Sequence, residues 1–216
     1  MNTVVFLGPS LEPAVAAGLA DVELLPPIKR GDIDALLARP VRPERIGIVD
    51  GEFMQSLSIS PKEVLRALDS GVEMWGSSSM GALRAAELDV FGMTGVGQVY
   101  ELFASGEIDA DDEVAITFDP ETLAPLCEPM VNIRVALSAA RDRGVVPADV
   151  ADAFVRAAKS LYFPDRRMNN VFAVLGDDIS PEHREQLRTF LRTDAPDAKR
   201  ADAVALLSSL GASRGA

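Results

Sequence analysis

The sequence predicts an α/β fold with a mainly parallel, Rossmann-like sheet, helices on both faces of that sheet, and an α-helical subdomain after it. In the first half, short apolar runs rich in β-branched residues alternate with segments of helical periodicity, which is the pattern of βαβ units. In the second half, helical periodicity dominates. We therefore expect an α/β core domain at residues 1–120 and a helical subdomain packed on it at residues 121–216.

The strands of the core are predicted from short apolar runs that mostly stop at Gly, Pro or Asp. They are expected at residues 3–7, 22–25, 46–49, 72–75 and 114–118. Helices are expected at residues 11–19, 32–38, 61–70, 80–90 and 99–105. Ser10 is the predicted N-cap of the first helix. Ser60-Pro61-Lys62-Glu63 predicts a capping box at the start of the third, because it combines a serine N-cap, an N1 proline and an N3 glutamate.

The sequence changes character after the fourth predicted strand and its helix. Residues 91–97 are glycine-rich and predict a loop. Further along, breakers at glycine and proline separate four helix patterns, which lie at residues 131–143, 147–162, 181–192 and 198–210. These patterns define the predicted helical subdomain.

Net charge, cysteine count and apolar runs disfavour several classes of protein. The 216 residues carry 33 acidic and 21 basic side chains, a formal net charge of −12, which disfavours a nucleic-acid binder. The single cysteine, Cys127, excludes an internal disulfide and is typical of a reducing compartment. The sequence shows no signal peptide and no run of ~20 apolar residues that would span a membrane. We therefore expect a cytoplasmic protein with no membrane association and no nucleic-acid partner.

Three predicted strands end in residues that suit a binding site. They are followed by Gly8-Pro9-Ser10, by Asp50-Gly51 and by the segment Gly76–Gly81. Because ligands bind beyond the carboxyl ends of the strands in open parallel sheets, these loops are expected to converge on one site.

The serine run Ser77-Ser78-Ser79 is the sharpest element of this predicted site. It joins a strand to a helix, so hydroxyls and free backbone N–H groups can hold an anion or a developing oxyanion. Ser79, flanked by the small residues Ser77 and Gly81, also has the spacing of a nucleophile elbow. A triad would need the only histidine, His183, which lies in a charged helix pattern and is not favoured. The alternative is that the serines only cap the helix.

Several charged residues are further candidates for the site, and some of them allow two interpretations. Arg84 and Glu87 are three residues apart on an otherwise apolar helix, so they either line a pocket or form a surface ion pair. Asp50 is either a catalytic carboxylate or a turn residue. The acidic residues between Glu107 and Glu113 lack the pattern of a calcium loop and predict a solvated turn rather than a metal site. Arg134 is a candidate to reach the site from the helical half.

Several segments have a familiar sequence. They are Gly8–Leu11, Pro26-Pro27 with Gly31-Asp32, Ile46–Gly51, Ser78–Leu88, Phe91–Gly97, Asp111–Ala115 and Glu128–Arg134. Together they resemble the TfuA-like family, and the string Ser79–Glu87 is the most specific part. The resemblance extends to about residue 165, and beyond Arg167 it is confined to generic helices.

The resemblance implies a role in sulfur chemistry. TfuA-like proteins are encoded beside YcaO enzymes, which activate backbone amides with ATP, and together they convert a peptide bond to a thioamide. One route is hydrolysis of a thiocarboxylated ThiS-like carrier to release sulfide. The implied partners are a YcaO enzyme, that carrier and a precursor peptide; no cofactor or metal is implied. Many relatives have a histidine where this chain has Pro61, so a role for it is not carried over.

This reaction gives the candidate residues roles. The N–H groups after Ser78 and Ser79 would stabilise the oxyanion, and Arg84 would hold the sulfur-bearing group. Asp50 or Glu87 would orient or deprotonate the water. The remaining candidates are substrate-binding residues, namely Ser10, Ser77, Ser78, Gly81 and Arg134.

Two other functions compete with sulfide release by hydrolysis. In the first, the chain is a non-catalytic adaptor that docks YcaO and channels sulfide. In the second, it is a small anion- or phosphate-binding α/β protein. In either sulfur role, one cysteine excludes a two-cysteine persulfide relay within the chain.

Overall fold

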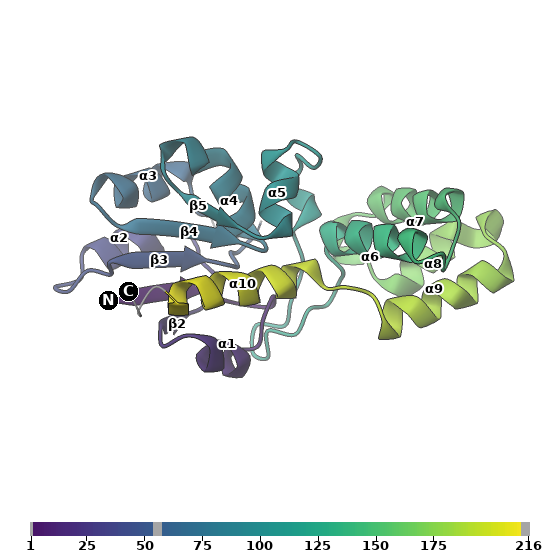
Figure 1. Cartoon of the computed structure of the whole chain (residues 1–216), viewed down its shortest axis with the longest axis horizontal. Helices are drawn as coiled ribbons and strands as arrows, with labels where there is room; N and C mark the ends of the chain where they lie inside the picture. The colour runs from purple at the N-terminus through teal and green to yellow at the C-terminus, as the bar shows by residue number, and fades with distance from the viewer. Residues whose placement is uncertain (1, 54–57, 213–216) are drawn as a thin grey trace. The chain divides into compact units, whose positions relative to one another are not determined.

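The computed structural model describes residues 2–53 and 58–212 (Figure 1). Contacts divide the chain into two compact units. We call Met1–Asp111 with Lys199–Ala216 the sheet unit, and Asp112–Ala198 the helical unit. This boundary lies at residue 111 rather than at the predicted residue 120, and the last helix belongs with the sheet rather than with the other helices.

The sheet is parallel throughout, with the strand order β2-β1-β3-β4-β5. The strands are β1 (Thr3–Phe6), β2 (Glu23–Leu25), β3 (Arg45–Ile48), β4 (Glu73–Ser77) and β5 (Thr94–Val96). The order reverses direction between β1 and β3, and the crevice at such a switch point is where doubly wound sheets bind ligands. The predicted α/β fold is confirmed, and so is the parallel sheet.

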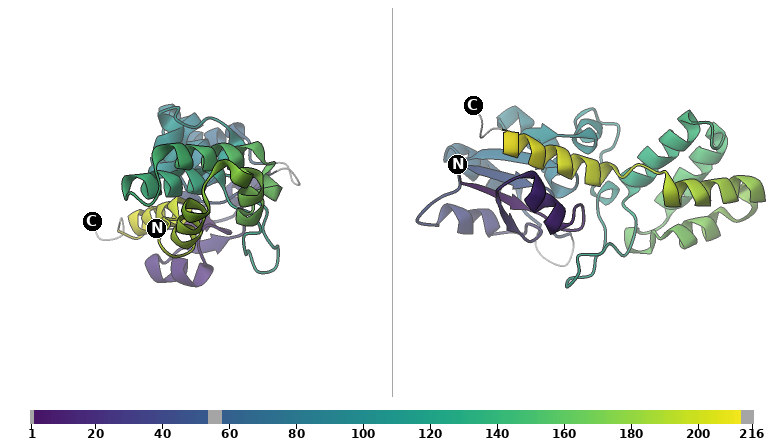
Figure 2. Two further views of the ribbon diagram at one scale, coloured as in Figure 1. Left: turned by 90° about the vertical axis from the view of Figure 1, so that its right-hand side faces the viewer. Right: turned by 60° about the horizontal axis from the view of Figure 1, so that its bottom comes forward.

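Helices cover both faces of this sheet. Alternation along β1 sends Val4 and Phe6 to one face and Val5 and Leu7 to the other. The first face packs against α2 (Asp32–Leu37), α3 (Pro61–Asp69) and α4 (Met80–Leu88). The second face packs against α1 (Pro13–Leu19) and α10 (Ala198–Ala212) (Figures 1 and 2). The helix α5 (Gln98–Ala104) follows β5 and contacts it and α4.

The last helix packs on the sheet because β3 leaves room for it. A Cβ at Gly47 would lie 3.2 Å from side-chain atoms of Leu206 and Leu210, so the glycine lets α10 approach closely. Both leucines are buried in the same apolar cluster as Val5. The helix pattern at 198–210 was therefore predicted correctly, although its packing partner was not evident from the pattern.

Three predicted elements of the sheet unit and its border are wrong in detail. The loop predicted at 91–97 contains β5, whose Gly95 leaves space for the ring of Tyr100. The strand predicted at 114–118 does not form, since its backbone makes only one isolated bridge, from Phe118 to Pro125. The first helix begins at Pro13 with Glu12 as N-cap, because the Ser10 side chain is used elsewhere.

The helical unit is built around one apolar cluster. It contains α6 (Met130–Asp142), α7 (Ala148–Ser160), α8 (Met168–Leu175) and α9 (Pro181–Thr193), of which α8 was not predicted. Phe154 and Phe172 meet edge to face at the centre, with ring centroids 5.2 Å apart.

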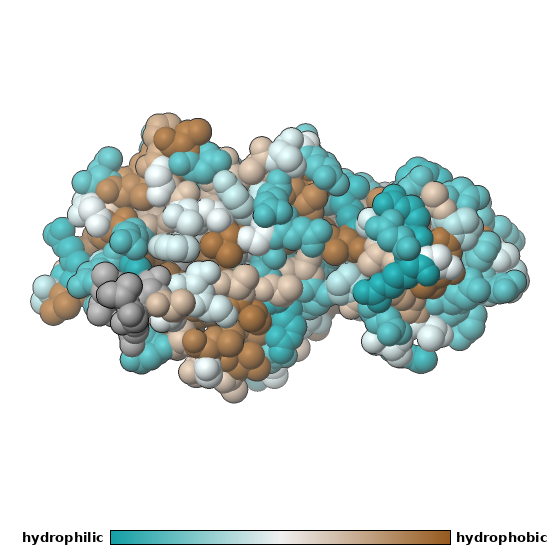
Figure 3. All heavy atoms as spheres, in the orientation of Figure 1, coloured by the Kyte–Doolittle hydropathy of each residue, from teal (hydrophilic) through white to brown (hydrophobic). Residues whose placement is uncertain are grey.

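In the view of Figure 3, brown residues gather over α1 on the surface of the sheet unit. The α1 sequence contains no charged residue, and Val15 on it is 38% exposed. Among the described residues, no helix combines the length and the hydropathy needed to cross a membrane.

Asp202 of α10 fastens α5 to the sheet unit. Its two carboxylate oxygens accept hydrogen bonds from the backbone N–H groups of Gln98 and Val99, at 2.9 and 2.7 Å. Gly97 just before them has a φ of 96°, and a Cβ there would lie 2.2 Å from the Asp202 carboxyl carbon. Burial raises the pKa of Asp202 to about 6, against the lowering effect of these hydrogen bonds.

This carboxyl makes the stability of the sheet unit depend on pH. The folded pKa of about 6 exceeds the ordinary aspartate value of 3.8, so the folded state binds the proton more tightly. The Asp202 contribution is therefore fully present below pH 3.8 and is lost as the pH rises through 6. We expect it to add about 1 kcal/mol to the free energy of unfolding between pH 7 and pH 5. Urea unfolding of Asp202→Asn should lack this increment; an identical pH profile in variant and wild type would contradict it.

Candidate functional site

Three loops meet at the carboxyl edge of the sheet, as the sequence predicts. The Gly8 N–H donates to the Asp50 carboxylate at 2.9 Å, which joins the loops after β1 and β3. The Gly81 N–H donates to the Val49 carbonyl at 3.3 Å, which joins the start of α4 to the end of β3. The candidate site therefore lies beside the β1/β3 switch point.

Close backbone packing holds α4 in this position. A Cβ at Gly81 would lie 1.7 Å from the Ile48 carbonyl oxygen, and one at Gly76 would lie 2.1 Å from the Gly81 carbonyl oxygen. A side chain at either glycine is incompatible with this spacing. Gly81 therefore acts as a packing residue that sets the first turn of α4 against β3.

Asp50 organises the loop after β1. The side chain is 1% exposed, and Oδ2 accepts from the backbone N–H groups of Gly8 and Ser10 at 2.9 and 3.1 Å. Oδ1 accepts from the Ser10 hydroxyl at 2.7 Å. These three bonds satisfy donors that would otherwise be buried without a partner. Asp50 and Ser10 are thus brought together, and the geometry gives Asp50 a positioning role.

The serine run forms a strained turn between β4 and α4. Ser78 has a φ of 64°, and the Ser79 N–H donates to the Ser77 carbonyl at 2.7 Å. A three-residue turn with positive φ at its centre is the rarer and strained form of the γ-turn. Strain of this kind concentrates at functional sites. The sequence predicts that the N–H groups after Ser78 and Ser79 hold the oxyanion, whereas the structure shows the first of them, the Ser79 N–H, engaged in the turn.

The serine hydroxyls supply uncommitted donors instead. Ser77 and Ser78 are fully buried, and within the described residues neither Oγ has a hydrogen-bond partner. A buried hydroxyl without a partner is costly, so two neighbouring ones mark a place where a polar ligand group would be stabilised. The serine run is evident in the sequence, whereas the positive φ and the unpartnered hydroxyls are features of the folded structure alone.

Arg84 and Glu87 form the ion pair that their spacing allows. Arg84 Nη1 lies 2.7 Å from Glu87 Oε2, and Arg84 Nε donates to the Ile59 carbonyl at 3.1 Å. The Arg84 side chain is 13% exposed and the Glu87 side chain 40% exposed. The pair is therefore half-buried and ties α4 to the segment before α3, while part of the Glu87 carboxylate stays open to water.

Arg134 belongs to the helical unit and is already paired there. Its guanidinium binds Glu113 through Nε and Nη2, at 2.8 and 2.9 Å. Lys159 and Arg166 complete a network with Glu113 and Asp112. Burial opposes ionisation of both acids, but hydrogen bonds from these cations outweigh it and lower the pKa of Asp112 and of Glu113. The end of the predicted acidic turn is thus an ion-pair network, and no described group of three His, Cys, Asp or Glu residues is arranged to hold a metal.

The single cysteine and the single histidine of the chain lie in the helical unit. Cys127 is buried, and its sulfur accepts from the Thr117 N–H at 3.1 Å and from the Thr117 hydroxyl at 3.4 Å. His183 lies in the first turn of α9, where its N–H donates to the Ser180 hydroxyl. The Cys127 thiol is thus engaged by Thr117, and the His183 bond is made by the backbone and involves no imidazole nitrogen.

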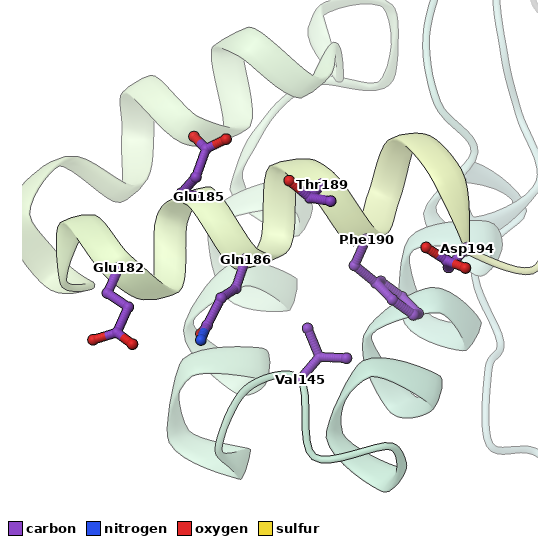
Figure 4. Close-up of a pocket in the computed structure, with 7 residues that line it drawn as sticks. All are labelled: Val145, Glu182, Glu185, Gln186, Thr189, Phe190 and Asp194. Carbon is purple, nitrogen blue, oxygen red and sulfur yellow. The ribbon is translucent and has the colours of Figure 1, made fainter.

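The helical unit also carries an open groove of about 560 Å³. Figure 4 shows it along α9, with Glu182 and Asp194 at opposite ends and Phe190 and Val145 between them. Its charged lining residues are all acidic, the third being Glu185. An acidic groove repels an anionic substrate, so it does not suit the anion chemistry of the serine run.

Comparison with known proteins identifies the family. A family model described as TfuA-like protein matches residues 50–167. This region exceeds half of the 216-residue chain and includes Asp50, the serine run, Arg84, Glu87 and Arg134. Among curated proteins, no match to the chain was found.

Proposed function

The chain belongs to the TfuA-like family, and on this premise we propose that it acts with a YcaO enzyme in thioamide formation on a ribosomal peptide or protein. Its part in the reaction is to release sulfide by hydrolysing the thiocarboxylate of a ThiS-like carrier. The observation that carries the proposal is the pair of unpartnered buried hydroxyls at Ser77 and Ser78, beside the switch point and at the start of α4.

The proposed reaction consumes one water. Water attacks the carbonyl carbon of the thiocarboxylate, a C–O bond forms, and the C–S bond breaks as the tetrahedral intermediate collapses. The carrier leaves as a carboxylate and sulfur leaves as hydrogen sulfide, with both protons coming from the water. The reaction therefore needs no oxidant or reductant.

Each site residue has a role in this reaction. The hydroxyls of Ser77 and Ser78 would donate to the oxyanion, because the Ser79 N–H is used in the turn. Arg84 would hold the negatively charged sulfur-bearing group, since it lies on α4, the helix that begins directly after the serine run. Glu87, whose carboxylate is partly open, would accept the proton of the attacking water. Asp50 would keep the Ser10 loop in position.

Sulfide release by the purified chain without YcaO tests this function. Ser78→Ala should reduce the rate by about 10²–10³-fold, the usual effect of removing an oxyanion donor. The other site variants are Arg84→Ala, Glu87→Gln and Ser79→Ala. The matched control is Glu101→Gln on the exposed side of α5, which is expected to keep the wild-type rate. If all four site variants release sulfide at the wild-type rate while remaining folded, this site assignment is wrong.

A second function is favoured by one observation. The serine run and Asp50 are almost fully buried, so the substrate reaches them only if the site opens. A non-catalytic adaptor that docks YcaO and channels sulfide would not need such access. Sulfide release no faster than the spontaneous hydrolysis of the carrier would favour this adaptor.

A further inference from the structure

A groove of about 470 Å³ lies in the sheet unit, at the start of α3. Its lining comes from the loop before α2, from α2 itself and from the first turns of α3 (Figure 1). The lining residues are Arg30, Gly31, Asp34, Ser60, Lys62, Glu63 and Arg66. Neither the family match nor the proposed reaction assigns a role to this groove.

The two acidic residues of the groove are already occupied. Glu63 is 2% exposed; its Oε2 accepts from the Gly31 N–H at 2.7 Å, and its Oε1 accepts from the Ser60 N–H and hydroxyl. Asp34 accepts three hydrogen bonds from Arg66, at 2.8 to 3.0 Å. The negative charges of the lining are therefore neutralised or buried.

Two cations of the groove remain open. Arg30 and Lys62 are exposed, and neither forms an ion pair within the part of the chain that the structure describes. They face the groove from different elements, since Arg30 follows β2 and Lys62 is in the first turn of α3. The uncompensated charge of the groove is thus positive, in a chain whose net charge is −12.

The groove adjoins the candidate site on two sides. The Ile28 N–H donates to the Asp50 carbonyl at 2.9 Å, and Arg30 follows two residues later. Arg84 donates to the carbonyl of Ile59, which directly precedes the lining residue Ser60. A macromolecule bound in the groove would therefore lie close to Asp50 and Arg84 of the candidate site.

We propose that this groove docks an acidic segment of the protein that presents the thiocarboxylate, an inference that rests on the function proposed above. A chain of net charge −12 repels an acidic partner that approaches from most directions. Carboxylates entering the groove would instead pair with Arg30 and Lys62, so the local charge selects the face on which the partner binds. The groove thus supplies partner binding, and the serine turn supplies the chemistry.

Charge reversal separates binding from chemistry. Arg30→Glu and Lys62→Glu are each compared with Arg42→Glu, an exposed arginine of the same unit outside the groove that makes the same change in charge. The first measurement is the Kd of a ThiS-like carrier in its carboxylate form, at 50 and 500 mM salt. We expect both groove variants to weaken binding about tenfold at low salt and to approach the wild type at high salt, because screening removes the charge contribution. Arg42→Glu should bind like the wild type.

The second measurement uses two thiocarboxylate substrates. In the groove variants, the KM for the thiocarboxylated carrier should rise while kcat is unchanged, and hydrolysis of thioacetate, which is too small to use the groove, should keep the wild-type rate. Equal carrier binding by Arg30→Glu, Lys62→Glu and Arg42→Glu would overturn the docking proposal. Weaker binding by the groove variants, with no hydrolysis by the wild type, would support docking and refute the catalytic function.

Discussion

Replacing Gly81 with alanine is expected to cost more than about 4 kcal/mol of folding free energy, an exceptional value for one added methyl group. The new Cβ would lie 1.7 Å from the Ile48 carbonyl oxygen and 2.6 Å from its carbon. Both atoms belong to the backbone of β3, so no side-chain rotation relieves the clash. Either α4 moves away from the sheet or β3 is displaced, and both changes open the apolar core beneath α4.

Urea unfolding checks this expectation, with Gly18→Ala as the matched control. Gly18 lies inside α1, and nothing lies within 4 Å of a Cβ built there. Alanine at that position should raise stability by about 0.4–1 kcal/mol, because it restricts the unfolded chain and suits a helix. A Gly81→Ala protein that unfolds within 1 kcal/mol of the wild type would mean that α4 does not approach β3 this closely.

The effect on the candidate site follows from the same packing. The Gly81 N–H joins α4 to the end of β3, and Ser79 is the N-cap of α4. A displaced α4 would carry the serine turn away from Asp50. A folded but inactive Gly81→Ala protein would therefore still indicate that helix placement, rather than the identity of residue 81, matters for the reaction.

Local sequence patterns predicted the elements whose determinants are themselves local. The capping box of α3 forms as predicted, because Ser60 and Glu63 are three residues apart and need no distant partner. In contrast, β5 is three residues long and contains a glycine, so its sequence shows no strand pattern. Its place in the sheet depends on β4 and on the Tyr100 ring, which periodicity does not report.

The features of the candidate site likewise fall into those that the sequence predicts and those that depend on distant partners. Convergence of the three loops follows from the rule for parallel strands, and the Arg84–Glu87 pair follows from helical spacing. The Asp50–Ser10 bond joins residues 40 positions apart, so the convergence of their loops is predictable from the sequence but the bond itself is not. Likewise, Glu113 is 21 residues from Arg134, and their pairing within the helical unit had no signal in the sequence.

Replacing Arg166 with alanine is expected to destabilise the helical unit by about 3–5 kcal/mol, because four hydrogen bonds of a buried guanidinium are lost, each worth about 1 kcal/mol. The Arg166 side chain is fully buried. Its nitrogens donate to the carbonyls of Asp112, Ala158 and Leu161, at 3.0, 3.1 and 3.3 Å, and to the Asp112 carboxylate at 2.9 Å. One guanidinium therefore ties the end of α7 to the segment that precedes α6.

The next residue in the chain provides the control. Arg167 is exposed and makes no side-chain hydrogen bond or ion pair within the described residues, so Arg167→Ala should change stability by less than about 0.5 kcal/mol. Thermal and urea unfolding of the two variants, measured side by side, separate the buried network from a general loss of positive charge. Equal stability of the two variants would contradict the assigned role of Arg166.

The pH dependence of the stability of Arg166→Ala is a second measurement, and loss of packing alone would not change it. Burial opposes ionisation, but the cations outweigh it and hold the folded pKa of Asp112 and of Glu113 below the ordinary values of 3.8 and 4.5. Each acid therefore stabilises the fold above its unfolded pKa, and this contribution is lost as the pH falls through the folded pKa. In Arg166→Ala, Asp112 keeps Lys159 but loses one of its two cations, so less stability remains to be lost on acidification. We expect the stability difference between wild type and variant to shrink below about pH 4; a difference that stays constant to pH 3 would assign the whole effect of Arg166 to packing and backbone hydrogen bonds.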